Sequence, residues 1–174
     1  MNVLKKYFNY RQALIDQYIR GDMTKREYLN RNLDAVLALN IKPFKNVDTV
    51  DKGLFNYQYY NAMAKDAKME AYKYADKERA GVYNEKSNHY YYMKDKSTLR
   101  VLSLLNFIDV KAYFIKVRSK ELKNKLFEIV IENDGSSVIL HSRSSVILNR
   151  LREENCFVEG VKHSLIDTYI NHRY

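Results

Sequence analysis

The sequence contains little of what breaks or cross-links a chain. Its 174 residues include one proline, five glycines, one cysteine and no tryptophan. A single cysteine, Cys156, excludes an intramolecular disulfide and a cysteine-cluster zinc site. Its apolar neighbours predict a small buried hydrophobic residue rather than a reactive thiol. Because proline and glycine are scarce, we expect long helices with few loops.

Long apolar runs are absent as well. No stretch approaches the roughly 20 apolar residues that a membrane-spanning helix needs. The N-terminal MNVLKKYFNYRQ has neither the apolar core nor the small-residue cleavage site of a signal peptide. We therefore expect a cytoplasmic protein without a membrane contact. Hydrophobic residues at 46% and charged residues at 29% predict an ordered globular chain.

Motifs for catalysis and for cofactors are also missing. There is no glycine-rich phosphate loop and no G-x-S-x-G elbow. Four histidines are scattered without the spacing of a metal site: His89, His141, His163 and His172. His141 stands beside serines, but adjacent strand residues face opposite sides of a sheet and serines also serve as helix caps. We expect no enzymatic activity, no cofactor and no metal.

What is present begins with a well-marked helical hairpin. Apolar residues recur at helical spacing before Gly21, which predicts a helix end. Thr24 and Glu27 then form the capping-box pattern that opens a second helix, ending near Asn40. Residues 13–39 resemble the short helical hairpins of the SHOCT type. That resemblance implies at most a protein–protein contact.

Two longer helices are expected after a linker at residues 41–53, which holds the only proline. In the first of them, Ala64, Ala67 and Ala71 recur at helical spacing, which predicts a face that another helix approaches closely. The helical pattern weakens around Gly81 and then resumes. Residues expected to face inward include Leu33, Leu37, Leu102, Leu105 and Leu151, and those expected to face outward include Lys94, Lys96 and Arg100.

After Asp109 the apolar period changes from helical to alternating. The segments VKAYFIKVRS, KLFEIVIE and SVILHS predict three strands, and Asp134-Gly135 predicts a tight turn between the last two. Two helices should follow, one capped by Ser144 or Ser145 and one opened by Ser164.

The predicted fold class is therefore α+β. An N-terminal helical hairpin and two longer helices are followed by a small three-stranded antiparallel sheet with two C-terminal helices. We expect a helical hairpin at residues 1–40, a linker at 41–53 and an α+β domain at 54–174, together forming one compact unit.

Tyr90, Tyr91 and Tyr92 stand side by side before a leucine-rich stretch. Successive helical residues point about 100° apart, so three rings on a helix cannot form one flat face for stacking bases. We expect one or two rings to pack over the helix core and the rest to lie at its rim. Because tyrosine is enriched in interfaces, this cluster is a candidate contact for an unknown protein partner or for self-association.

The net charge of +9 suggests a second kind of partner. Most of the excess is interleaved with acids, as on an ordinary solvated surface. The segment KVRSKELKNK is the densest positive stretch, and Glu121 alone opposes its five cations: Lys116, Arg118, Lys120, Lys123 and Lys125. Solvated charges explain this segment, and contact with phosphate backbones is the alternative.

The order of helix, three strands and helix over about residues 95–153 is similar to a double-stranded-RNA-binding domain. The second helix of such a domain begins with a lysine-rich turn, whereas Arg143 stands alone here. The sequence therefore favours a non-enzymatic protein-interaction module. Weak, largely nonspecific nucleic-acid binding through residues 116–125 is the alternative.

Three segments of the C-terminal half carry a family resemblance: VKAYFIKVRSKELKNKLFEIVI, VILHS and SLIDTYINHRY. They resemble a family of short uncharacterised Firmicute proteins of the clostridial type, classed as a domain of unknown function. The resemblance extends over most of the chain. It implies a bacterial cytosolic protein and brings no activity, ligand or site residue with it.

Overall fold

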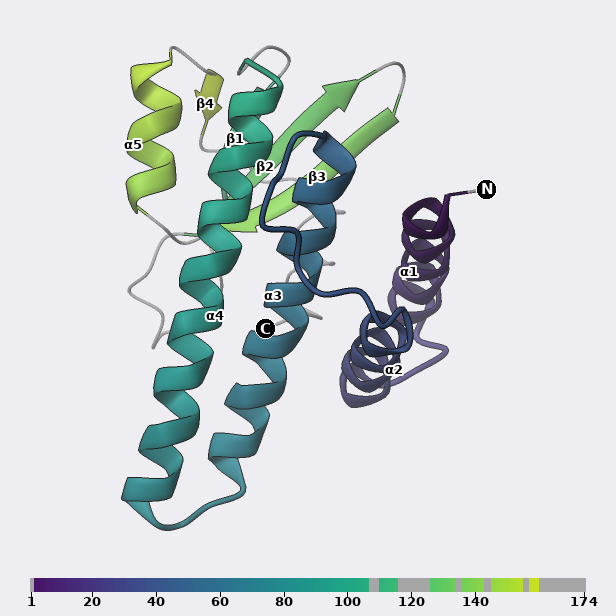
Figure 1. Ribbon diagram of the computed structural model, residues 1–174, viewed down its shortest axis with the longest axis vertical. Coiled ribbons are helices and arrows are strands. Elements are labelled where there is room, and N and C mark those ends of the chain that lie inside the picture. The colour runs from purple at the N-terminus through teal and green to yellow at the C-terminus, as the bar shows by residue number, and fades with distance from the viewer. Residues whose placement is uncertain are drawn as a thin grey trace. The chain divides into compact units, whose positions relative to one another are not determined.

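The computed structural model describes the chain over residues 2–106, 110–115, 126–133, 136–142, 145–154 and 157–159 (Figure 1). The chain divides into two compact units, Met1–Ser97 and Thr98–Tyr174. The division predicted from the sequence, with a linker at 41–53, is a different one. The predicted division, which concerns the parts that fold independently, stays a prediction.

The first helical hairpin joins α1 (Val3–Arg20) to α2 (Lys25–Ala38). Gly21 ends α1 in the left-handed conformation, with φ +83°, which glycine adopts without a steric penalty. Thr24 Oγ1 accepts a hydrogen bond from the Glu27 N–H at 3.2 Å, and the Glu27 carboxylate accepts one from the Thr24 N–H at 2.7 Å. The predicted helix end at Gly21 and the predicted capping box are confirmed.

The inner face of this hairpin packs on α3 (Val50–Tyr72). Their shared core is a cluster of buried residues from all three helices: Leu4, Tyr7, Val36, Phe55 and Ala62. Leu33 is packed partly buried against this cluster, as expected. Leu37 was expected to face inward as well, and this is wrong, because its side chain is 51% exposed. Val36 takes the inward position, and the next helical residue turns away by about 100°.

Residues between α2 and α3 are fixed by one side chain of α3. The Asn56 amide oxygen accepts a hydrogen bond from the Phe44 N–H at 2.8 Å, and the amide nitrogen donates to the Phe44 carbonyl at 2.9 Å. The Phe44 ring then lies edge-on to Phe55, with centroids 5.7 Å apart. The predicted linker is thus tied to the core at Phe44.

A second, longer hairpin is formed by α3 and α4 (Lys77–Leu104), which lie side by side (Figure 1). Ala64, Ala67 and Ala71 are buried, and the Ser87 hydroxyl of α4 donates to the Ala64 carbonyl at 2.9 Å. Such close backbone approach needs small side chains, so the predicted alanine packing face is confirmed. Helix α4 runs without interruption through Gly81, where the sequence pattern was weak.

Within the described residues of the Thr98–Tyr174 unit, the backbone forms a sheet and one further helix, α5 (Ser145–Glu153). The strands lie in the order β3-β2-β1-β4, with β2 antiparallel to both β1 and β3, and β4 parallel to β1. Their bounds are Val110–Ile115 for β1, Leu126–Asn133 for β2, Ser136–Ser142 for β3 and Phe157–Glu159 for β4. The expected three-stranded antiparallel sheet is wrong, because a fourth, parallel strand too short to show alternation joins it.

The predicted α+β fold class is also wrong. Among the residues whose side chains the structure describes, 79% are helical and none lies in a strand. The protein is therefore mostly helical. Leu102 and Leu151, which were expected to face inward, are fully buried. Other predicted features lie outside the described residues: the Asp134-Gly135 turn, Cys156, and the helix opened by Ser164.

Candidate functional site

The three consecutive tyrosines point in different directions from α4. Tyr90 is half-buried, and its ring centroid lies 6.3 Å from that of Tyr60 on α3. Tyr91 is half-buried as well, whereas Tyr92 is 59% exposed. The turn of about 100° per residue accounts for this divergence. Two rings pack against the protein, and Tyr92 alone of the three is largely open to a partner.

Tyr90 ends a row of aromatic rings, which we call the aromatic row, that crosses α1, α3 and α4. Neighbouring centroids are 6.2 Å apart for Tyr7 and Phe55, 6.2 Å for Phe55 and Tyr59, 5.5 Å for Tyr59 and Tyr60, and 6.3 Å for Tyr60 and Tyr90. Edge-on and tilted pairs at such distances are favourable. Burial raises the pKa of Tyr59 and of Tyr60, and the nearby Tyr90 raises both further. The Tyr59 and Tyr60 hydroxyls therefore stay neutral, and the row braces α4 against α3.

On the side of α4 that faces solvent, exposed residues recur at helical spacing along its length. We call this side the α4 outer face and define it by Val82, Glu85, Lys86, His89, Tyr92 and Lys96, all of them exposed. Val82 is 61% exposed, so the face carries two large apolar side chains, Val82 and Tyr92, among charged ones. The Lys96 ammonium lies 5.5 Å from the centre of the Tyr92 ring.

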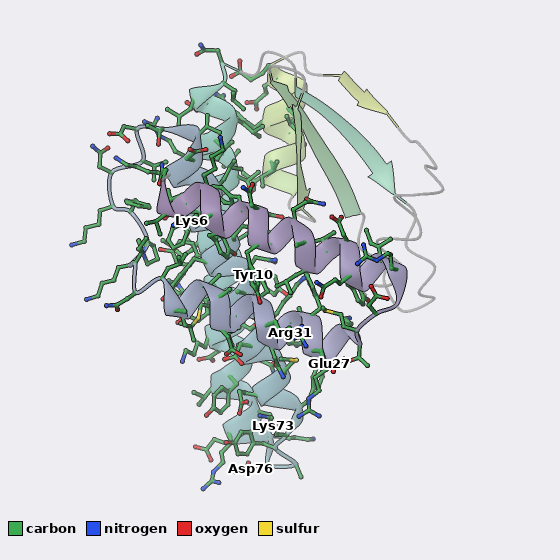
Figure 2. The ribbon with its side chains drawn as sticks, turned by 90° about the vertical axis from the view of Figure 1, so that its right-hand side faces the viewer. Lys6, Tyr10, Glu27, Arg31, Lys73 and Asp76 are labelled. Carbon is green, nitrogen blue, oxygen red and sulfur yellow. The ribbon has the colours of Figure 1, made fainter. Side chains whose placement is uncertain are left out.

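The outer side of the first hairpin has a different composition. Lys6 and Tyr10 on α1 and Glu27 and Arg31 on α2 are exposed and point into solvent (Figure 2). Hydrogen bonds from Thr24 lower the pKa of the Glu27 carboxyl, so this side carries both signs of charge. Its one exposed aromatic ring among the described residues of the hairpin, Tyr10, offers a control for the α4 outer face.

Lys94 does not belong to that face, although the sequence placed it outward. Its side chain is buried, with the ammonium 5.2 Å from the ring centre of Tyr57 and 5.7 Å from that of Tyr91. Aromatic faces attract a desolvated cation. Ser87 is seven residues earlier and therefore lies on the same side of α4, so spacing from the small residues that contact α3 could have revealed the inward position.

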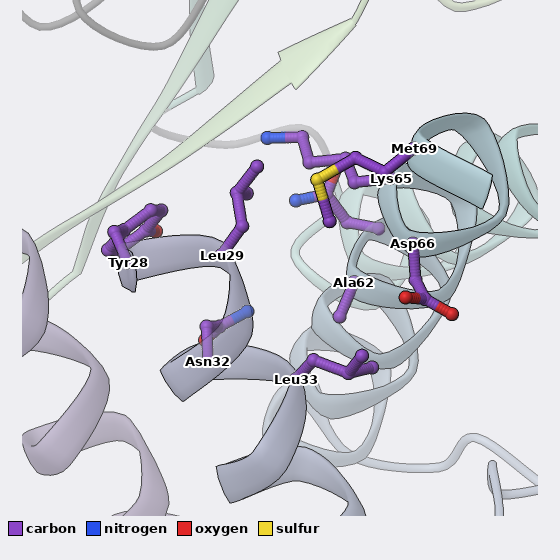
Figure 3. A pocket seen from close by; sticks show the side chains of 9 residues that line it. Tyr28, Leu29, Asn32, Leu33, Ala62, Lys65, Asp66 and Met69 are labelled. Atoms are coloured by element: carbon purple, nitrogen blue, oxygen red, sulfur yellow. The ribbon is translucent and has the colours of Figure 1, made fainter. Parts of the chain in front are cut away.

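A small cavity opens between α2 and α3 (Figure 3). Tyr28, Leu29, Asn32 and Leu33 line it from α2, and α3 adds Asn61, Ala62, Lys65, Asp66 and Met69. The space open to the centre of a water molecule is about 10 Å³, which is far below the size of a metabolite site. Asn32 and Asn61 were not singled out from the sequence, although Asn32 falls midway between the buried Tyr28 and Val36.

A larger groove lies in the second unit, between the C-terminal end of α4 and the length of α5. It measures about 360 Å³ and is lined by Leu99, Ser103, Val146, Asn149, Arg150 and Glu153. Arg150 contacts the carboxylates of Glu153 at 3.2 Å and of Glu154 at 2.7 Å. Because its charge is already balanced, this groove is a poor site for an anion.

No group of three or more histidine, cysteine, aspartate or glutamate side chains is placed to hold a metal ion within the described ranges. No helix among those residues is long and apolar enough to cross a membrane. The basic segment with Lys116, Arg118, Lys120, Lys123 and Lys125 lies outside the described residues.

Over residues 1–174 the chain matches the model of a family of unknown function, DUF6648. This match confirms the predicted membership in a domain of unknown function. It shows neither a Firmicute origin nor a SHOCT-type hairpin. Comparisons with curated proteins and with solved structures gave no match.

Proposed function

The chain belongs to DUF6648, and because a family of unknown function supplies no activity, we propose a function from the chain's own surface. The protein is a non-enzymatic interaction module that binds a protein partner, or a second copy of itself, through the α4 outer face. The observation that carries the proposal is the exposure of Tyr92 and Val82 on one side of a helix that the aromatic row braces from behind.

The composition of this face suits a contact between proteins. Tyrosine supplies a large contact area at a low cost in side-chain entropy, and its hydroxyl keeps a hydrogen-bond donor at the rim. Binding energy in interfaces is concentrated in a few such side chains surrounded by polar ones. Tyr92 fills the first role, with Val82 adding apolar contact area beside it, whereas Glu85, Lys86 and Lys96 fill the second.

The test compares three baits in affinity capture and in light scattering. The wild-type chain, a Val82→Ser/Tyr92→Ser variant and a Tyr10→Ser control are each immobilised and also examined for self-association. We expect the wild type and the Tyr10→Ser control to retain the same partner or the same oligomer, and the double variant to lose it. Equal behaviour of all three baits contradicts the proposal. Matching melting curves exclude unfolding as the cause of a loss.

Nucleic-acid binding through the basic segment 116–125 is the second candidate. Its support is the density of cations in the sequence, five of them opposed by Glu121 alone. Phosphate contacts release counterions, so affinity should fall with salt by a log–log slope of about −0.9 per contact on duplex DNA. Changing Lys120, Lys123 and Lys125 to Ser should flatten this slope in oligonucleotide-binding measurements. A wild type that binds no oligonucleotide at low salt rules the candidate out.

The cytoplasmic location expected from the sequence likewise stays a prediction. Fractionation of cells that make the full-length chain tests it directly. The predicted location is independent of the interaction proposed for the α4 outer face.

A further inference from the structure

We propose that Tyr74 and Tyr83 form an oxidative modification site, at which a one-electron oxidant joins the two rings by a carbon–carbon bond to give dityrosine. Tyr74 lies just beyond the end of α3, and Tyr83 lies near the start of α4. The site is independent of the proposed interaction surface, because neither tyrosine belongs to the α4 outer face. The proposal rests on the placement of the two rings and on their exposure.

The two rings are stacked across the turn that joins α3 to α4. Their centroids are 5.4 Å apart, and their planes differ by only 6°. Parallel rings at such a distance form a favourable offset stack. The pKa of Tyr83 is raised, first of all by its hydrogen bond with the Tyr74 side chain. The hydroxyl-bearing ends of the two rings therefore lie next to each other, and these are the ends at which tyrosines couple.

Both side chains are also accessible to a dissolved oxidant. Tyr74 and Tyr83 are partly exposed, and residues 75–79 between them are all exposed. A second stacked pair provides the contrast. The ring centroids of Tyr18 and Tyr28 are 5.2 Å apart and their planes differ by 18°, but these side chains are only 7% and 3% exposed. The two pairs therefore share the stacked geometry and differ in their accessibility.

The reaction removes one electron and the phenolic proton from each tyrosine. Each phenoxyl radical shares its unpaired electron with the ring carbons beside the hydroxyl-bearing carbon, and one such carbon from each ring forms the new bond. The hydrogen on each bonded carbon then moves to the oxygen, which restores both phenols. Hydrogen peroxide, acting through a haem peroxidase, accepts the two electrons and two protons and becomes two molecules of water. Because the rings are already side by side, coupling within one chain needs no collision between chains.

The experiment oxidises the full chain with hydrogen peroxide and a haem peroxidase and maps the tryptic peptides of the denatured monomer by mass spectrometry. Trypsin cleaves after lysine and arginine, so Tyr74 falls in peptide 74–77 and Tyr83 in peptide 80–86, each with a single tyrosine. We expect these two peptides to be joined and to be lighter than their sum by two hydrogen atoms, in a yield that does not depend on protein concentration. If the joined peptide is absent from the monomer, the proposal is wrong.

Two matched variants and the buried pair identify the site. Tyr74→Phe keeps the ring and removes the phenol, so dityrosine at Tyr83 should disappear from the monomer. Tyr72→Phe removes the phenol of a neighbour that is 77% exposed, and it should retain the joined peptide. Equal loss of dityrosine in both variants contradicts the proposal. Peptides 12–20 and 27–31, which contain the buried stacked pair, should stay separate. If they join in the same yield, accessibility does not select the site, and the proposal is overturned.

Discussion

The two helical hairpins of the Met1–Ser97 unit are held together in different ways. The α1–α2 hairpin is defined at its turn, by the left-handed Gly21 and by the capping box of Thr24 and Glu27. The α3–α4 hairpin is defined along its faces, where buried alanines let the Ser87 hydroxyl reach the Ala64 carbonyl. Neighbouring residues in the sequence determine the first arrangement. The second depends on contacts with a partner helix, which the sequence does not identify.

The largest expected effect comes from Phe55, which serves both hairpins. It is fully buried and contacts Tyr7 of α1, Phe44 of the connecting segment and Tyr59 of the aromatic row. Phe55→Ala should lower the free energy of unfolding by about 3–5 kcal/mol, because a cavity remains. Urea denaturation measures it. The 77% exposed Tyr72 is the control, since Tyr72→Ala should change the same quantity by less than about 0.5 kcal/mol.

The next substitution should weaken the α3–α4 hairpin alone. Ala64 is fully buried under the close contact with Ser87, so Ala64→Leu should separate the two helices at a cost of about 1–3 kcal/mol in unfolding free energy. Thermal and urea denaturation measure it. Ala13→Leu, on the exposed side of α1, should be nearly neutral because leucine and alanine are both good helix formers. Equal effects at both positions would show that close packing does not define α3–α4.

A glycine-to-alanine substitution at two positions sharpens the comparison, because its effect on stability should have opposite signs at the two positions. Gly21 has φ +83°, so Gly21→Ala places a side chain in the left-handed region and should cost about 1–2 kcal/mol. Gly81 lies inside α4, and a Cβ added there has no atom within 4 Å. Gly81→Ala should therefore stabilise the protein by about 0.5–1 kcal/mol through helix propensity. Melting temperatures of the two variants test both signs. A loss of stability at Gly81 would falsify this assignment.

The smallest expected effect concerns pH. Hydrogen bonds from Thr24 lower the pKa of Glu27 in the folded state. The capping box therefore stabilises the protein fully above the unfolded-state pKa of about 4.3, and this contribution is lost as pH falls through the lower folded-state value. Denaturation curves between about pH 2 and pH 6 should show a shallower dependence for Glu27→Gln than for the wild type. Identical slopes would mean that the box does not titrate with folding.

The same contrast explains how much of the fold could be predicted from the sequence. The Gly21 helix end and the Thr24–Glu27 box are local patterns, and both were found. The α+β class was wrong because it rested on the alternating apolar pattern after residue 109, whereas the helices contain most of the described residues. Strand β4 has three residues, too few for a period to be recognised.

At the candidate sites, the sequence did not show whether polar residues point inward or outward from their helices. Lys94 looked like one of several outward lysines, because its neighbours on the inner side, Tyr57 and Tyr91, come from two separate segments. Asn32 and Asn61 lie on different helices, and no spacing along the chain joins them. Tyr92 was correctly included in a cluster, but only the course of α4 shows that it differs from Tyr90 in exposure.

The pair of hydrogen bonds between Asn56 and Phe44 has a consequence for solvent access to the segment between the hairpins. Phe44 belongs to no helix or strand, yet its amide hydrogen is bonded to a buried side chain. Its exchange with deuterium should therefore be slow, like that of a core helix, whereas the amides of Lys45 and Asn46 exchange quickly. The connection between the hairpins then behaves as a fixed spacer, and trypsin should cleave after Lys45 only once α3 has opened locally.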